Sequence, residues 1–195
     1  MNDLTAFVLA GGKSTRMGSD KAFLPWAGGT LLSHALKLAG TVARQVRIVG
    51  DAKKFANFGT VVEDVYRGRG PLGGIHAALS NTRTEWNLLL AVDLPLLEPR
   101  FLEYLVAQAR EARAMVTVPL AAGGYQPLTA VYRSEFAVAC EQSLREGRNK
   151  IDPLFATVNT RVIQAEELAQ AGFLQEMFRN LNTPEDFERA NQIRS

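Results

Sequence analysis

Basic side chains and glycines gather near the beginning of this 195-residue chain, directly after an apolar run over Ala6–Ala10. Gly11 and Gly12 end that run, and three cationic residues follow within the next nine positions: Lys13, Arg16 and Lys21. Adjacent glycines permit positive φ and bring backbone N–H groups close to a ligand, and fixed positive charge suits a polyphosphate. The usual P-loop spacing is absent, because no Gly-Lys-Ser/Thr ends the run. The stretch therefore predicts a phosphate-binding loop, and the alternative is a solvated basic loop after an edge strand.

Two aspartates follow other apolar segments. Asp93 comes after Trp86–Val92, a nearly unbroken apolar run that predicts a central parallel strand covered on both faces. Asp64 comes after a shorter strand expected over Thr60–Glu63. Ligands of an open parallel sheet bind at the carboxyl ends of its strands, so we expect both aspartates to lie near the loop that begins at Gly11-Gly12.

The two aspartates are expected to do different chemistry. Asp93 is predicted to hold Mg²⁺, which binds through one or two carboxylates together with substrate phosphates. Its alternative role, capping the helix that starts at Pro99, is disfavoured because the two residues are too far apart in sequence. For Asp64 two roles stay open: accepting hydrogen bonds from a base or ribose, or pairing with Arg67 or Arg69.

Strands and helices alternate through the first hundred residues, which predicts an α/β fold with a mostly parallel sheet. Two close strands around Gly123-Gly124 predict an added antiparallel element. We expect strands over Ala6–Ala10, Gln45–Val49, Thr60–Glu63, Trp86–Val92, Ala114–Leu120, Pro127–Tyr132 and Thr160–Ile163. We expect helices over Thr30–Val42, Leu72–Ser80 and Pro184–Gln192, one from Pro99 and one around Cys140, a helical turn over Asp51–Phe55, and an extended piece over Ala22–Trp26.

Length and composition limit the possible classes of protein. Residues 1–195 are expected to form one domain, and 47% hydrophobic with 22% charged residues is typical of a globular protein. A formal net charge of +2 is too small to favour nucleic acid or a membrane surface, so a small anion is the expected partner. The one cysteine, Cys140, cannot form an internal disulfide, and no apolar run reaches the length of a membrane span. We expect a cytoplasmic protein without a signal peptide.

A second glycine-rich segment offers a different function. Gly68–Gly73 matches the G-x-G-x-x-G dinucleotide fingerprint and has Asp93 about twenty residues further on. An NAD(P)-binding oxidoreductase is therefore an alternative. This alternative is disfavoured for two reasons. The fingerprint needs a tight turn from strand to helix, but the four residues Val65–Gly68 separate the acidic end of the strand from the first useful glycine. An oxidoreductase would also leave Gly11–Lys21 without a role.

Five motifs together resemble those of the molybdenum cofactor guanylyltransferases. They are LAGGKSTRMGSDK (Leu9–Lys21), GPLGG (Gly70–Gly74), VDLP (Val92–Pro95), YQPL (Tyr125–Leu128) and NLNTPED (Asn180–Asp186). The resemblance covers essentially the whole chain and implies a three-layer, mostly parallel, Rossmann-like nucleotidyltransferase fold. It implies transfer of GMP from GTP to the terminal phosphate of molybdopterin, with Mg²⁺ as cofactor and pyrophosphate as product. A cytidylyltransferase acting on the same cofactor, a sugar-phosphate nucleotidylyltransferase and a non-catalytic nucleotide sensor remain alternatives.

The resemblance also assigns roles by position. The residues expected to bind GTP are Leu9, Ala10, Gly11, Gly12, Lys21, Asp64 and Asp93. Lys21, Asp93 and Arg16 are the expected catalytic residues, Asp93 is the expected metal ligand, and Asn180 and Asn182 are expected on the pterin side. Transient contact with cofactor-biosynthesis or acceptor proteins is implied as well. This interpretation requires Lys21 and Asp93 to face one another on the same side of the sheet.

The chain departs from the family pattern at two positions. Gly50 follows the second expected strand where the family often has asparagine, so one nucleotide contact is not expected here. Thr15 precedes Arg16 where the family commonly has two adjacent arginines.

Overall fold

The computed structural model describes residues 3–11, 20–66, 68–181 and 183–194. Gly12 and Arg16 of the basic loop, together with Arg67 and Asn182, lie outside these residues, so the expectations placed on them stay predictions. Within the described ranges, no helix is both long and apolar enough to cross a bilayer.

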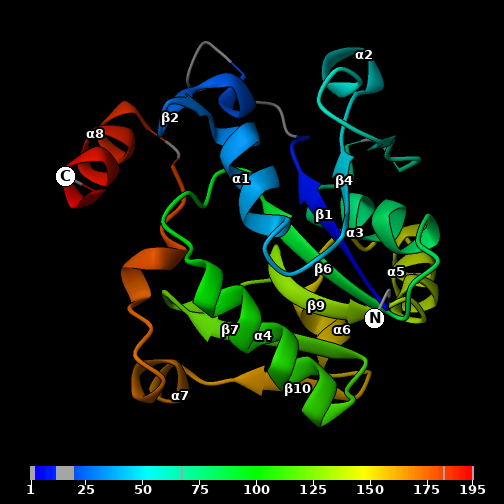
Figure 1. Cartoon of the computed structure of the whole chain (residues 1–195). Coiled ribbons are helices and arrows are strands. Elements are labelled where there is room, and N and C mark those ends of the chain that lie inside the picture. The colour runs from blue at the N-terminus through cyan, green and yellow to red at the C-terminus, as the bar shows by residue number, and fades with distance from the viewer. Residues whose placement is uncertain (1–2, 12–19, 67, 182, 195) are drawn as a thin grey trace.

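An eight-stranded sheet forms the centre of the described chain (Figure 1), in the order β10-β7-β9-β6-β1-β4-β5 with β8 paired to β7. Its strands are β1 (Leu4–Leu9), β4 (Gln45–Val49), β5 (Val61–Val62), β6 (Trp86–Ala91), β7 (Val116–Ala121), β8 (Gly124–Tyr125), β9 (Thr129–Arg133) and β10 (Thr160–Ile163). The four strands β6, β1, β4 and β5 are parallel to one another. β9 is antiparallel to both β6 and β7, so the antiparallel pair expected around Gly123-Gly124 is β7 with β9. The short strand β8, which was not expected, also pairs antiparallel with β7. The α/β fold with a mostly parallel sheet is confirmed.

The central strands are buried along their whole length. Every residue of β1 and β6 is buried, as expected of parallel strands with a layer of helices on each face. Because successive side chains of a strand point to opposite faces, Ala6 and Val8 pack in one core cluster and Phe7 and Leu9 in the other. The continuous apolar runs of the sequence are therefore the consequence of a three-layer arrangement.

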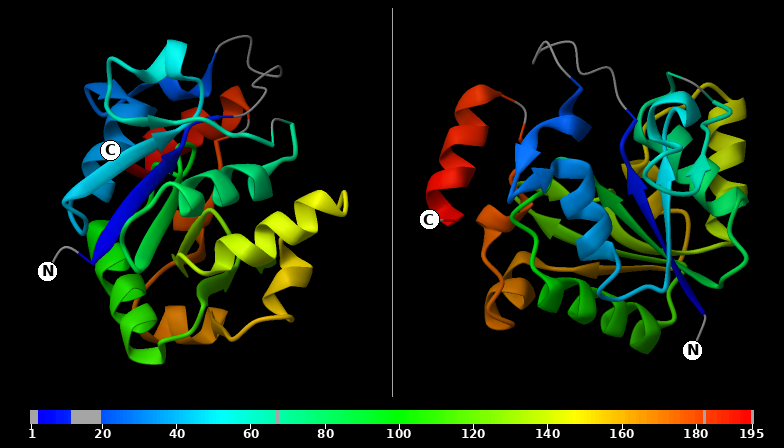
Figure 2. Two further views of the ribbon diagram at one scale, coloured as in Figure 1. Left: turned by 90° about the vertical axis from the view of Figure 1, so that its right-hand side faces the viewer. Right: turned by 45° about the horizontal axis from the view of Figure 1, so that its top comes forward.

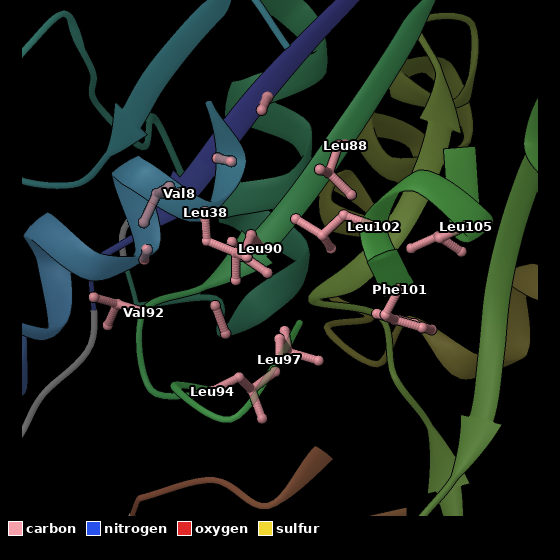
Figure 3. Packing of buried hydrophobic residues seen from close by; sticks show 14 of the residues in the cluster. Val8, Leu38, Leu88, Leu90, Val92, Leu94, Leu97, Phe101, Leu102 and Leu105 are labelled. Carbon is pink, nitrogen blue, oxygen red and sulfur yellow. The ribbon is translucent and has the colours of Figure 1, made fainter. Parts of the chain in front are cut away.

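Helices cover both faces of the sheet (Figure 2). One core cluster contains residues of α1 (Leu31–Ala39), α2 (Ala52–Phe55), α4 (Pro99–Ala112), α7 (Ala165–Gln170), η2 (Gln175–Phe178) and α8 (Pro184–Arg194). The other contains residues of α3 (Pro71–Ser80), α5 (Phe136–Arg145) and α6 (Asp152–Phe155). Figure 3 shows the first cluster, in which Leu88 and Leu90 of β6 point toward Leu102 of α4.

Local sequence signals explain where helix α1 begins. The Ser33 N–H donates to Thr30 Oγ1 at 3.1 Å, and the Thr30 N–H donates to Ser33 Oγ at 2.8 Å. This reciprocal capping box satisfies backbone donors that the first helical turn leaves without partners. The expected helix start at Thr30 is confirmed, although the helix ends at Ala39 and not at Val42.

The expectation for Ala22–Trp26 was wrong in part. Lys21–Phe23 forms a 3₁₀ helix, η1, because the Asp20 carboxylate accepts a hydrogen bond from the Ala22 N–H at 3.2 Å and so caps the turn. Only β2 (Pro25–Trp26) is extended, and it pairs with β3 (Gly29–Thr30). Helices α6 and α7 and the 3₁₀ helix η2 had no counterpart among the expected elements.

Candidate functional site

The carboxyl ends of β1, β4 and β6 lie side by side. Leu9 is in register with Ala91 of β6 and with Val49 of β4. Beyond the strands, the Ala10 N–H donates to the Val49 carbonyl at 3.0 Å and the Val92 N–H donates to the Leu9 carbonyl at 3.2 Å. The carboxyl ends of β1 and β6 therefore lie at the same edge of the sheet (Figure 1). Gly11 and Asp93 follow these ends closely in the chain, as expected.

Lys21 and Asp93 are in direct contact at this edge. Lys21 Nζ lies 3.3 Å from Asp93 Oδ2, although 72 positions separate the two residues in the chain. Both side chains are largely buried, with 19% of the Lys21 side chain and 22% of the Asp93 side chain exposed. The requirement that the two residues lie on the same side of the sheet is thus met.

The turn that carries Lys21 is held on several sides. Asp20 caps η1, and its carboxylate also forms an ion pair with Lys54 of α2, in which Lys54 Nζ lies 3.0 Å from Asp20 Oδ2. The Phe23 ring packs against Phe55 and Phe58, with ring centroids 5.7 and 5.6 Å apart. These contacts anchor Lys21 between α2 and the end of β6.

The loop that carries Asp93 is fixed by its backbone. The Leu181 N–H donates to the Asp93 carbonyl at 3.0 Å, and His34 Nε2 of α1 donates to the Pro95 carbonyl at 3.1 Å. Val92 and Leu94, on either side of Asp93, are buried in the first core cluster (Figure 3). The peptide at Asp93 is therefore held while its carboxylate faces Lys21.

The Asn180 segment reaches this loop from the far end of the sequence. Asn180 is exposed, and it directly precedes Leu181, which is fully buried and hydrogen-bonded to Asp93. The structure thereby brings Asn180 and Asp93 into one region. Asn182 lies outside the described residues.

Asp64 lies at the end of β5 and is held against the start of α3. The Tyr66 N–H donates to Asp64 Oδ1 at 2.8 Å. A Cβ atom added to Gly73 would lie 2.6 Å from Asp64 Oδ2, so the carboxylate occupies space that only a glycine leaves open. Among the described residues, Arg69 forms no ion pair with Asp64.

Two glycines of α3 connect the end of β5 with the end of β1. Gly74 directly follows Gly73, the glycine that makes room for Asp64. A Cβ atom at Gly74 would lie 3.0 Å from Leu9 Cδ2. The close approach of α3 explains why GPLGG carries two glycines inside a helix, where glycine is intrinsically unfavourable. Sequence reasoning treated this segment as a possible dinucleotide fingerprint and missed its contact with Asp64. That fingerprint needs a tight strand-to-helix turn, whereas β5 ends at Val62 and α3 begins at Pro71.

The end of β4 shows what replaces the asparagine that is common in the resembling family. A Cβ atom at Gly50 would lie 2.8 Å from two carbons of the Phe55 ring. It would also lie 3.6 Å from the backbone nitrogen of Gly11. The Phe55 ring, which is 1% exposed, therefore fills the space beside Gly50. Phe55 was not singled out from the sequence, because its contact depends on how α2 folds back.

The donor groups at this edge fit a metal ion that is completed by a substrate. Among the described residues there is no group of three His, Cys, Asp or Glu side chains that would hold a metal by itself. Asp93 offers one carboxylate, which already attracts a cation, the Lys21 ammonium. This is the donor set expected for Mg²⁺ bound through one or two carboxylates and phosphate oxygens.

The chain is similar to known proteins over most of its length. The profile of the MobA-like NTP transferase domain matches residues 6–162. A protein of Carboxydothermus hydrogenoformans named "Probable molybdenum cofactor guanylyltransferase" is 33% identical over 194 residues, which cover 99% of this chain and 98% of the relative. A protein of Pelotomaculum thermopropionicum with the same name is also 33% identical, over 97% of this chain and 93% of the relative.

A solved structure has the same architecture. Molybdopterin-guanine dinucleotide biosynthesis protein A from Archaeoglobus fulgidus superposes with a TM-score of 0.83 at 27% identity, covering 97% of each chain. The Rossmann-like nucleotidyltransferase fold expected from the resemblance is confirmed.

Proposed function

This chain belongs to the MobA-like NTP transferase family, and on that premise we propose that it transfers GMP from GTP to the terminal phosphate of molybdopterin. The relatives named above, matched over almost their whole length, support this activity. The single observation that carries it is the contact between Lys21 Nζ and Asp93 Oδ2 at 3.3 Å, at the edge of the sheet where β1 ends before Gly11. We further propose that residues 1–195 act as one nucleotidyltransferase domain.

The reaction needs no nucleophile from the protein. An oxygen of the molybdopterin phosphate attacks the α-phosphorus of GTP, a new P–O bond forms, and the bond to the bridging oxygen breaks as pyrophosphate leaves with the electron pair. Catalysis then depends on positioning and on stabilising charge. The Lys21 ammonium neutralises charge on the phosphates, and Arg16 is proposed to assist it.

Asp93 is the residue proposed to hold Mg²⁺. When bound there, the ion would polarise the phosphate oxygens of the nucleotide. The hydrogen bond from the Leu181 N–H to the Asp93 carbonyl and the buried neighbours of Asp93 hold its backbone in place for this role.

The nucleotide itself is proposed to lie along the ends of β1 and β5. Leu9, Ala10 and Gly11 offer backbone groups, with Gly12 continuing the loop, and Asp64 accepts hydrogen bonds from the guanosine part. The tight packing of Asp64 on Gly73 supports a fixed acceptor at that position. Asn180 and Asn182 are proposed to contact the pterin substrate, because their segment is hydrogen-bonded to the Asp93 loop.

The setting of the enzyme follows from the same proposal. A reducing compartment such as the cytoplasm fits Cys140, which is buried and free. Transient contacts with proteins that supply or accept the cofactor are proposed from the reaction alone.

Pyrophosphate release with molybdopterin, Mg²⁺ and each of the four nucleoside triphosphates tests the proposal. We expect turnover with GTP. Lys21→Ala and Asp93→Ala are each expected to lower the rate by about 10²–10³-fold, as is typical when a preorganised electrostatic contact is removed. Lys37→Ala and Glu103→Ala, which change exposed residues of α1 and α4, serve as matched controls with unchanged turnover.

Other outcomes would replace the proposal. Preference for CTP, or turnover only with a sugar phosphate, would assign a different substrate to the same mechanism. Tight NADH binding without pyrophosphate release would favour an oxidoreductase. Near-normal rates in either alanine variant of the site would refute the assignment of Lys21 and Asp93.

A further inference from the structure

The carboxylate proposed to bind the metal ion already carries a cation in the structure. Lys21 Nζ lies 3.3 Å from Oδ2 of Asp93. An ammonium and a divalent metal ion compete for the same oxygen lone pairs, because each is attracted to the single negative charge of the carboxylate. Lys21 therefore competes with a metal ion for at least one oxygen, Oδ2, of this carboxylate.

The surroundings make this pairing effective. With about one fifth of each side chain exposed, the ion pair is screened less than a pair on the open surface. The neighbours Val92 and Leu94 are 8% and 4% exposed, so little water reaches the carboxylate from its own strand end. Asp93 is thus a poor site for a metal ion as long as Lys21 remains on it.

The two partners differ in their freedom to move. The Asp93 carbonyl is tied to the Leu181 N–H at 3.0 Å, so its short side chain stays at the strand end. Lys21 has a flexible four-carbon stem, while its backbone is held in the capped turn η1, where the Leu24 N–H donates to the Lys21 carbonyl at 3.1 Å. The ammonium can therefore change partner without any change in the backbone.

Building on the function proposed above, we propose that Lys21 is a counter-cation that keeps metal ions off Asp93 until a nucleotide arrives. The triphosphate draws the ammonium away from the carboxylate, and the carboxylate and the phosphates together then complete the site for the metal ion. Mg²⁺ gives up its water shell reluctantly and needs several oxygen donors, which Asp93 by itself does not supply. Metal and nucleotide consequently bind cooperatively, and by linkage each raises the affinity for the other to the same extent.

Binding of Mn²⁺ to the nucleotide-free protein tests this inference, with the signal of free Mn²⁺ in electron paramagnetic resonance as the readout. Lys21→Met keeps the length of the side chain and removes its charge, so we expect it to bind Mn²⁺ about 3–10-fold more tightly than wild type, the range expected for loss of one partly exposed ion pair. Lys21→Arg, which keeps the charge, is expected to bind like wild type. Lys37→Met removes a charge from the exposed side of α1 and is the control that should change nothing.

The same titration with a GTP analogue bridged by an α,β-methylene group measures the cooperativity. In wild type the analogue is expected to increase Mn²⁺ affinity at least about tenfold, and in Lys21→Met by clearly less, because the variant has no pairing to release. Asp93→Asn is expected to lose Mn²⁺ binding without the analogue and, with it, to show no more binding than the analogue shows without protein, with circular dichroism confirming that the variant folds.

The outcomes separate this inference from the function on which it rests. If Lys21→Met binds Mn²⁺ no more tightly than wild type while Asp93→Asn loses the metal, the inference is overturned and the metal site stands. If Asp93→Asn binds Mn²⁺ with the nucleotide as well as wild type does, the proposed metal ligand itself is wrong, and the inference fails with it.

Discussion

The ends of β5 and β6 each place one aspartate at the same edge of the sheet, and the two are held in different ways. Asp64 accepts a hydrogen bond from a backbone amide, Tyr66 N–H, and lies against the backbone of α3 at Gly73. Asp93 faces the ammonium of a long, flexible side chain, Lys21. One carboxylate is held by backbone atoms that cannot leave, and the other by a partner that can.

The difference teaches that residue type and strand position do not decide what an aspartate does. A carboxylate fixed by main-chain donors is preorganised to accept hydrogen bonds in one geometry, which suits recognition of a substrate. A carboxylate paired with a mobile cation can exchange that cation for another, which suits a metal ion that arrives with its substrate. Variants of the two strand ends should therefore differ in which kinetic constant they change.

The largest effects are expected from Asp93→Asn compared with Asp64→Asn. Asp93→Asn is expected to lower kcat by about 10²–10³-fold, because in the proposed mechanism it removes charge next to the reacting phosphates. Asp64→Asn is expected mainly to raise the KM for GTP, by about tenfold, since it weakens a binding contact far from bond breaking. Steady-state pyrophosphate release measures both constants, and equal losses of kcat in the two variants would remove the distinction.

A smaller effect is expected from moving Asp64 without changing it. The Cβ of Gly73→Ala would lie 2.6 Å from Asp64 Oδ2 and 3.0 Å from the Tyr66 carbonyl, so the carboxylate must shift. We expect the KM for GTP to rise about 3–10-fold with kcat little changed, an effect of about one kcal/mol on nucleotide binding. Gly124→Ala is the matched control, because nothing lies within 4 Å of the added Cβ. A wild-type KM in Gly73→Ala would show that the position of Asp64 does not matter for the nucleotide.

The smallest effect is expected on the free energy of unfolding at acidic pH, through His76 of α3, the helix that Asp64 lies against. The Tyr66 ring packs edge-on against His76 of α3, with centroids 5.1 Å apart, and burial lowers the pKa of His76 below its usual value of 6.5. Below about pH 6.5 the unfolded chain then takes up a proton that the folded protein resists, so stability is lost as the pH falls through this range.

Urea unfolding at pH 7.5 and pH 5.5 measures this contribution. Wild type is expected to lose more stability between the two pH values than His76→Gln, which has no imidazole to protonate. An equal loss in both proteins would mean that His76 is not a source of the acid sensitivity.

The elements that could be predicted from the sequence are those with strong local patterns. The apolar runs of β1 and β6, and the polar residues that follow them, were enough to place Gly11 and Asp93 at one edge of the sheet. Helix α7 was missed because its capping partner Gln164 gives a weak signal, and because its six residues contribute just one buried apolar side chain, Leu168.

Contacts between distant segments could not be predicted. Nothing near Asp64 in sequence indicates that Gly73 makes room for its carboxylate, and nothing near Asp93 indicates that Leu181 binds its carbonyl. The filling of the space beside Gly50 by Phe55 likewise depends on the path of α2. All three features depend on tertiary packing, and the contacts of Gly73 and Leu181 are the ones that distinguish the two aspartates.

The hydrogen bond from Leu181 to Asp93 has a consequence for the order in which the protein becomes active. During synthesis, β6 and its neighbours β1 and β4 emerge from the ribosome long before residue 181 is made. A nascent chain can therefore assemble the central strands while the Asp93 peptide still lacks its partner. Leu181 is translated after these strands, so a chain that stops before it has the central scaffold but lacks the hydrogen bond that holds the proposed metal ligand.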